Sequence, residues 1–174
     1  MGVREAKILG GVGSILSLVG MFVPKVGWIV SIIGFVLLYL GYKKISEATG
    51  RSEIISSFII AVVLAIVSAI IIAFGGTSAM LGIFSMMGHG RGGLLALGII
   101  LFILAWIIAI VAYFFYKKAL DTTNEATNIS SFKTAGLLMF IGAILMIVVV
   151  GFIIIIVGRV FEIIAFFSLP DTLG

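Results

Sequence analysis

The side chains with the greatest capacity for metal chemistry gather around a single histidine. His89 lies in a glycine-rich run with Arg91, and Met80, Met86 and Met87 come shortly before it. Thioethers and an imidazole are ligands that Cu(I) accepts, so His89, Met86 and Met87 form a weak candidate metal site. The favoured interpretation is a flexible surface loop whose methionines dip into a membrane interface, and no cofactor is expected.

Other catalytic chemistry has few residues on which to draw. The chain has one histidine and no cysteine, so it lacks both a histidine-ligated metal cluster and a Cys–His nucleophile. Its acidic residues lie in connecting segments, termini and the C-terminal tail, at spacings that suggest no paired-carboxylate site. Uncharged apolar runs also argue against proton-coupled transport, which normally uses ionisable groups within the membrane. We therefore expect that the protein is not an enzyme.

The elements that would hold these residues are strongly apolar. Hydrophobic residues make up 63% of the 174 and charged residues 10%, against roughly 45–50% and about 25% in soluble domains. A chain of this size folded in water would still expose about 30% of its surface, so the apolar surplus predicts a membrane protein. The net charge of +4 is carried by residues that flank apolar runs, which indicates lipid headgroups rather than nucleic acid as the partner.

Two matching segments separate the apolar runs. Residues 42–58 (YKKISEATGRSEIISSF) and 116–132 (YKKALDTTNEATNISSF) are equally long and share eight identical positions. Each carries a lysine and an acid four residues apart near its start, which indicates that the preceding helix continues into it. Gly50 and Asn124 occupy the same position in the two segments, and both residue types tolerate the left-handed conformation that ends a helix.

The sequence predicts an all-α, polytopic transmembrane bundle with a tandem parallel hairpin repeat of period 74. The five expected spans cover residues 8–23, 26–41, 54–74, 94–115 and 134–158, with a glycine-dense loop over 75–93. The apolar tail, 159–169, is expected to lie in the interface with Arg159 paired to Glu162, or alternatively to dock on a partner or on a second copy of this chain. A six-span alternative turns near Gly151 and places Arg159 near mid-membrane, where a charge costs at least about 2.5 kcal/mol. Five spans are therefore favoured.

Small residues on the first two spans predict where these helices pack. They recur at steps of three or four, so they share one face of each helix and let the backbones approach closely. The predicted packing residues are Gly10, Gly13, Ser14, Ser17, Gly27, Ser31 and Gly34.

The distribution of lysine and arginine predicts the orientation in the cell membrane. The N-terminus and both matching segments share one side in the five-span scheme, against Lys25, Arg91 and Arg159 on the other. The residues of the first side are Arg4, Lys7, Lys43, Lys44, Arg51, Lys117, Lys118 and Lys133. This side is expected to be cytoplasmic and the C-terminus to lie outside. The pairs Lys43–Lys44 and Lys117–Lys118 are interpreted as topology determinants or lipid-headgroup contacts.

Several stretches together resemble a known family. They are the opening KILGGVGSILSLVG, Pro24 with GWIVSIIGFVLLYLGYKKIS, and the strings FKTAGLLMFIGAIL, VVVGFIIIIVG and IAFFSLP near the end. In this combination the chain resembles an uncharacterised, mainly archaeal family of membrane proteins known as domain of unknown function nine-nine-six. The resemblance implies an archaeal source and a multi-span helical fold, and it implies no activity.

Two functional hypotheses remain after these exclusions. The first is a non-catalytic accessory or scaffolding subunit that packs in the bilayer against other membrane subunits or a second copy of itself. It follows from the missing catalytic chemistry combined with abundant small-residue packing surface. The alternative is a small channel or transporter for an uncharged solute, with a path between the two repeats lined by Ser31 or Ser68.

Overall fold

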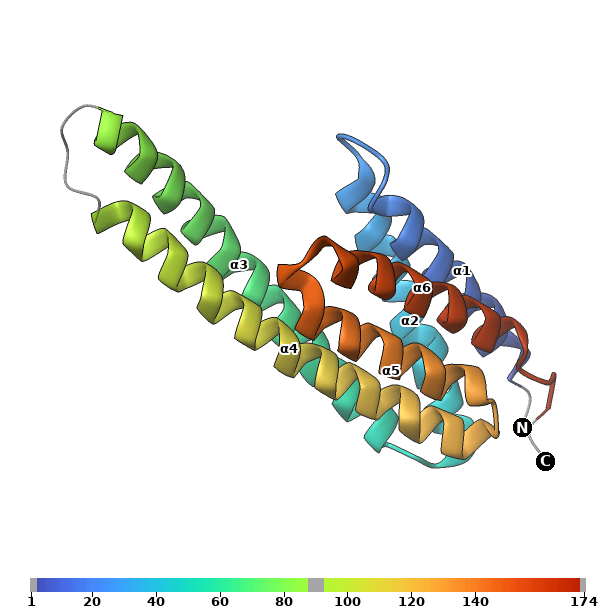
Figure 1. Ribbon diagram of the computed structural model, residues 1–174. Helices are drawn as coiled ribbons and strands as arrows, with labels where there is room; N and C mark the ends of the chain where they lie inside the picture. Colours follow the sequence, from blue (N-terminus) through green and yellow to red (C-terminus); the bar gives the residue numbers. More distant parts are fainter. Residues whose placement is uncertain (1–2, 88–92, 173–174) are drawn as a thin grey trace. The chain divides into compact units, whose positions relative to one another are not determined.

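The computed structural model describes residues 3–87 and 93–172 (Figure 1). These residues form α-helices joined by short connections, with no strand among them. The elements are α1 (Arg4–Gly20), α2 (Gly27–Thr49), α3 (Glu53–Met87), α4 (Gly93–Thr127), α5 (Ser130–Ile144), the 3-10 helix η1 (Leu145–Ile147) and α6 (Val149–Phe167). The predicted all-α architecture is confirmed. Five stretches of the described helices are long and apolar enough to cross a membrane, and they lie in α2, in α3, in α4, in α5 together with η1, and in α6.

The chain divides into two compact units. Unit 1 combines residues 3–59 with 113–172, and unit 2 consists of residues 60–112. Unit 1 therefore holds α1, α2, α5 and α6 together with the N-terminal end of α3 and the C-terminal end of α4. Unit 2 is the remainder of the α3–α4 hairpin. The two matching segments of the sequence both lie wholly in unit 1.

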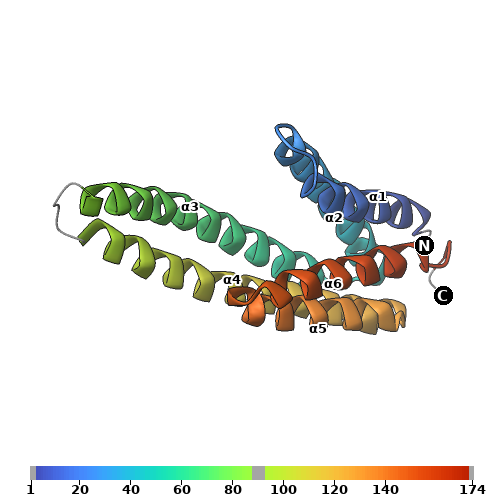
Figure 2. The ribbon, with the colours of Figure 1, turned by 45° about the horizontal axis from the view of Figure 1, so that its top comes forward.

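Helices α1 and α2 pack through facing glycines, in an antiparallel pair that Figure 2 shows clearly. A Cβ added at Gly13 would lie 2.8 Å from the carbonyl oxygen of Gly34, and one added at Gly34 would lie 2.8 Å from that of Gly13. Gly20 likewise faces Gly27 and the Ser31 hydroxyl. The absence of side chains thus lets the two backbones touch, as is typical of helix pairs in lipid.

Other small residues of α1 face inward as well. Ser14 and Ser17 are fully buried, and their hydroxyls donate to the carbonyls of Gly10 and Ser14, each over 2.9 Å. Gly10 provides the space that the Phe166 ring of α6 fills. A serine in this position satisfies its own hydroxyl and adds little bulk.

A branched side chain at the α1–α2 contact is expected to destabilise the protein. Gly13→Val should lower the free energy of unfolding by about 2 kcal/mol or more, because overpacking forces the helices apart. Gly93→Ala is the control, since nothing lies within 4 Å of a Cβ at Gly93. Alanine there should be neutral or stabilising by about 0.5 kcal/mol. Denaturant unfolding in detergent measures both, and equal effects would contradict the glycine contact.

Helices α5 and α6 form a hairpin where the sequence predicted one continuous span over 134–158. That prediction is wrong: α5 ends at Ile144, and Val148 is extended (φ −110°, ψ 138°) before α6 begins. Glycines allow the tight return, because Gly142 faces the Gly151 carbonyl and Gly158 faces that of Ala135. The expected interfacial tail, 159–169, is instead largely the second half of α6.

Helix α3 is longer than the sequence predicted. Residues 75–87, expected to begin a glycine-dense loop, continue α3 to Met87. Gly75 and Gly82 lie against α4, and Gly98 of α4 lies against Ala79, so three of these glycines serve helix contact. The Ser68 hydroxyl closes the same hairpin by donating to the Ala105 carbonyl over 2.8 Å. The small residues in this apolar stretch therefore indicate close packing of α3 against α4, not a loop.

Val3, Asp171 and the two matching segments meet at one end of unit 1, which we call the polar end (Figure 1). The backbone N–H of Val3 donates to the Asp171 carbonyl over 3.0 Å, and Lys7 donates to the Leu169 carbonyl. Val3 and Asp171 are therefore adjacent in unit 1. This adjacency was not expected from the five-span scheme, which placed the C-terminus opposite the N-terminus.

Ion pairs join the two matching segments to each other and to the start of α1. Arg51 pairs with Glu125 over 2.8 Å, and these two residues hold the same position in the two matching segments. Lys44 pairs with Glu5 over 2.8 Å, and the hydrogen bond from Lys44 lowers the pKa of the Glu5 carboxyl. These pairs are exposed, so each contributes little stability by itself. They do place both matching segments and the start of α1 next to one another at the polar end.

Candidate functional site

The buried polar residues of unit 1 centre on an ion pair within α6. Arg159 NH1 donates to Glu162 Oε2 over 2.7 Å, as the spacing of three residues predicted. Arg159 is 3% exposed and Glu162 is fully buried. The pairing expected from the sequence is therefore confirmed, but it lies inside the bundle and not in an interface. A buried charge pair persists only where further hydrogen bonds satisfy it.

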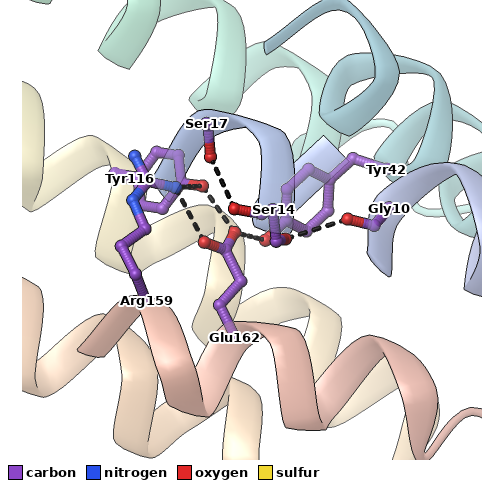
Figure 3. A network of polar contacts seen from close by, with 7 residues as sticks. All are labelled: Gly10, Ser14, Ser17, Tyr42, Tyr116, Arg159 and Glu162. Carbon is purple, nitrogen blue, oxygen red and sulfur yellow. Dashed lines mark hydrogen bonds and ion pairs between the residues drawn. The ribbon is translucent and has the colours of Figure 1, made fainter. Parts of the chain in front are cut away.

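Two tyrosines supply those hydrogen bonds (Figure 3). The hydroxyls of Tyr42 in α2 and Tyr116 in α4 each donate to Glu162 Oε1 over 2.5 Å. The Tyr116 hydroxyl also accepts a hydrogen bond of 2.8 Å from Arg159 NH1. Tyr42 and Tyr116 are the first residues of the two matching segments. One carboxylate of α6 thus accepts hydrogen bonds from the first residue of each matching segment.

Aromatic rings enclose this cluster. The Arg159 guanidinium lies over the rings of Phe35 and Tyr116, at 5.4 and 5.0 Å from their centroids. The Tyr42 ring packs against Phe58 at 5.1 Å and Phe166 at 5.0 Å. Rings that stack on a guanidinium offset part of its lost hydration. The Arg159 Nε atom nevertheless is buried and has no hydrogen-bond partner among the described residues.

Local sequence explains why these side chains converge. Helices α2 and α4 run past the apolar spans into the matching segments, so each carries its tyrosine where apolar sequence gives way to Lys-Lys. On α6, residues three apart share one face of the helix, which brings Arg159 and Glu162 together. Gly10 of α1 leaves room for Phe166 and lets α6 lie close. The cluster is therefore built at the junction of four helices.

The metal-site residues predicted from the sequence lie outside this cluster. His89 and the side chains of Met86 and Met87 fall outside the part of the chain that the structure describes. Met80 is described and is 62% exposed. Ser31 packs against Gly20, and Ser68 bonds within the α3–α4 hairpin. The two serines proposed to line a solute path are thus engaged in helix contacts.

Three of the four lysines proposed for lipid headgroups have an acidic partner. Lys43 pairs with Glu47 over 3.8 Å, Lys44 pairs with Glu5, and Lys117 pairs with Asp121. Lys118 is exposed. Each paired carboxylate offsets part of the attraction that a lysine would exert on an anionic lipid. The helices do continue through these pairs, to Thr49 in α2 and Thr127 in α4.

Sequence reasoning named Arg159 and Glu162 but not their setting, and it missed Tyr42 and Tyr116 as site residues. It treated the acids as lying outside the spans and used this against proton-coupled transport. That premise is wrong, because Glu162 lies inside a helix long and apolar enough to cross a membrane. The usable signal was a charge pair at helical spacing in apolar sequence, with a tyrosine at the start of each matching segment.

An all-helical unit closed around a buried ion pair, in a chain with several helices able to cross a membrane, defines a polytopic helical membrane protein. The chain belongs to the family described as protein of unknown function (DUF996), whose model matches residues 30–160. The family resemblance noted in the sequence is thereby confirmed. The chain is similar to an uncharacterized protein of Methanocaldococcus jannaschii, with 39% identity covering 99% of this chain and 96% of the relative. No solved structure matches it.

Proposed function

We propose that this protein is a non-catalytic accessory or scaffolding subunit that packs in the membrane through the α3–α4 hairpin. The observation that supports this role is the length of α3. The helix has 35 residues and carries no charged residue after Glu53, so its uncharged part is about 50 Å long. A hydrocarbon core is about 30 Å thick. Even at a tilt of about 40°, the uncharged part of α3 would extend about 40 Å along the membrane normal, which is longer than the core.

The surface of unit 2 supports the same role. Its described residues include no charged side chain, and most of its large apolar side chains are exposed. A partner must therefore be uncharged and at least as long as the hairpin. A second copy of this chain meets both conditions, whereas an ordinary span of about 20 residues does not. We propose self-association as the form that the scaffolding takes.

One face of α3 offers the closest approach for such a partner. Its small exposed residues recur at steps of three or four, and they are Ala65, Ala69, Ala73 and Gly76. Contact with α4 uses a different face, which includes Ser68 and Gly75. Small residues free of intramolecular contact let a second helix approach closely.

Cysteine cross-linking tests the proposal directly, because the natural chain has no cysteine. Ala69→Cys and Ala73→Cys should each give a disulfide-linked dimer when membranes are mildly oxidised. Val67→Cys, on the far side of α3 and also exposed, is the matched control and should stay monomeric. A strictly monomeric protein, by cross-linking and by mass after gentle detergent extraction, would overturn self-association. If it also co-purified with no membrane partner, the scaffolding role would fall as well.

We also propose that the polar end faces the cytoplasm. Arginines and lysines of the N-terminus and the matching segments gather on this side of unit 1, and Arg159, previously counted on the opposite side, is buried in the bundle. Basic residues near the ends of spans favour the cytoplasmic side. The bias therefore becomes stronger once Arg159 is removed from the count.

A further inference from the structure

Glu162 is bound in the way that a protein binds a free carboxylate. Both of its oxygens are buried, and both accept hydrogen bonds. Oε1 accepts from Tyr42 and Tyr116, and Oε2 accepts from Arg159 NH1. Three donors thus converge on one carboxylate, and one of them is a guanidinium, which makes a charge-assisted hydrogen bond.

The donors and the acceptor come from different parts of the chain. Tyr42 and Tyr116 come from α2 and α4, at the same position of the two matching segments, whereas Glu162 comes from α6. Each tyrosine hydroxyl donates to the same carboxylate oxygen, Glu162 Oε1, over 2.5 Å. Helix α6 therefore inserts its carboxylate between two hydroxyls that the rest of unit 1 presents.

The cluster also contains a donor that Glu162 does not use. Arg159 Nε is buried without a partner among the described residues, although a buried donor left unpaired is unfavourable. Glu162 therefore leaves part of the hydrogen-bonding capacity of Arg159 unused.

We propose that Tyr42, Tyr116 and Arg159 form a binding site for a small monocarboxylate, and that Glu162 is its built-in occupant. One cation sets the charge of the ligand at minus one. The surrounding rings of Phe35, Phe58 and Phe166 limit it to a small molecule with little polar surface beyond the carboxylate. In the natural protein the site is self-occupied, so α6 excludes external ligands. This inference concerns unit 1 alone and does not depend on the scaffolding role of the hairpin.

Removal of the occupant tests the site. Glu162→Ala should lower the midpoint of thermal unfolding in detergent, and sodium formate at about 100 mM should raise it again by about 5 °C or more. Sodium chloride at the same concentration is the control for ionic strength and should give less than half of that rise. Glu162→Gln keeps the pocket filled and should show no response to formate.

A second comparison identifies the donors. The triple variant Glu162→Ala, Tyr42→Phe, Tyr116→Phe should lose the formate response, while the rings that pack around the site remain. If Glu162→Ala folds only when it is extracted in formate, that result supports the site equally. The proposal is overturned if formate and chloride act alike, if the triple variant responds as Glu162→Ala does, or if Glu162→Ala is unfolded with and without formate.

Discussion

Glu162→Leu is expected to lower the free energy of unfolding by about 3–5 kcal/mol, the cost of leaving one member of a buried ion pair without its partner. Leucine is close to glutamate in size, so the loss arises mainly from the uncompensated Arg159 guanidinium, which is 3% exposed. The hydroxyls of Tyr42 and Tyr116 lose their acceptor as well. Unfolding in mixed micelles, followed by helical content, measures the difference.

The double variant Arg159→Met, Glu162→Leu is the control that separates charge from packing. Apolar residues that replace both members of a buried pair are often nearly neutral, so the double variant should recover most of the stability. The resulting coupling energy should reach about 2 kcal/mol or more, since the two residues are in direct contact. A double variant as unstable as the sum of the two single variants would mean that the pair makes no specific contribution.

Both termini and both matching segments are expected to be accessible from the same side of the membrane. The backbone hydrogen bond between Val3 and Asp171 and the ion pair between Arg51 and Glu125 join these segments at the polar end. The result should be all-or-none: Asp171→Cys and Ser52→Cys should react alike with a membrane-impermeant maleimide. Phe22→Cys, in the connection between α1 and α2, should react from the opposite side.

Inside-out vesicles and intact cells provide the two sides for this measurement. With the polar end in the cytoplasm, Asp171→Cys and Ser52→Cys should be labelled in inside-out vesicles and protected in intact cells. Labelling of Asp171→Cys from the same side as Phe22→Cys would contradict the arrangement of unit 1. Labelling of all polar-end positions in intact cells would instead reverse only the proposed orientation.

The sequence carried enough information to predict the helices and the small residues between the first two of them. Hydrophobic runs that end at Lys-Lys located α2 and α4. Small residues that recur every three or four positions along α1 and α2 identified Gly13 and Gly34 as contact residues, because close helix packing requires small side chains. Asn124 shows where such reasoning stops. It was expected to end a helix as Gly50 does in the first segment, but Asn128 adopts the left-handed conformation instead. Helix α4 consequently runs about one turn further into its segment.

The turn after α5 and the ionic cluster could not be predicted from the local sequence, because the residues that determine them lie outside the segments concerned. No proline or polar residue marks residues 145–148, and the glycines that permit the turn, Gly142 and Gly151, lie in the flanking helices. The cost of burying Arg159 argued against this hairpin because its partners were unknown. Tyr42 and Tyr116, distant in sequence, supply the missing compensation. Contacts between residues distant in sequence thus determine that Arg159 is buried, and the local sequence pattern does not reveal these contacts.

The opposite charges of Arg51 and Glu125 make the two halves of the chain non-interchangeable. A variant in which the first segment replaced the second would set arginine against arginine at this contact, and the reverse exchange would set glutamate against glutamate. Like charges that face each other disfavour association. At this contact each matching segment therefore favours the other over a second copy of itself, so the small energy of an exposed pair acts on the choice of partner and little on stability.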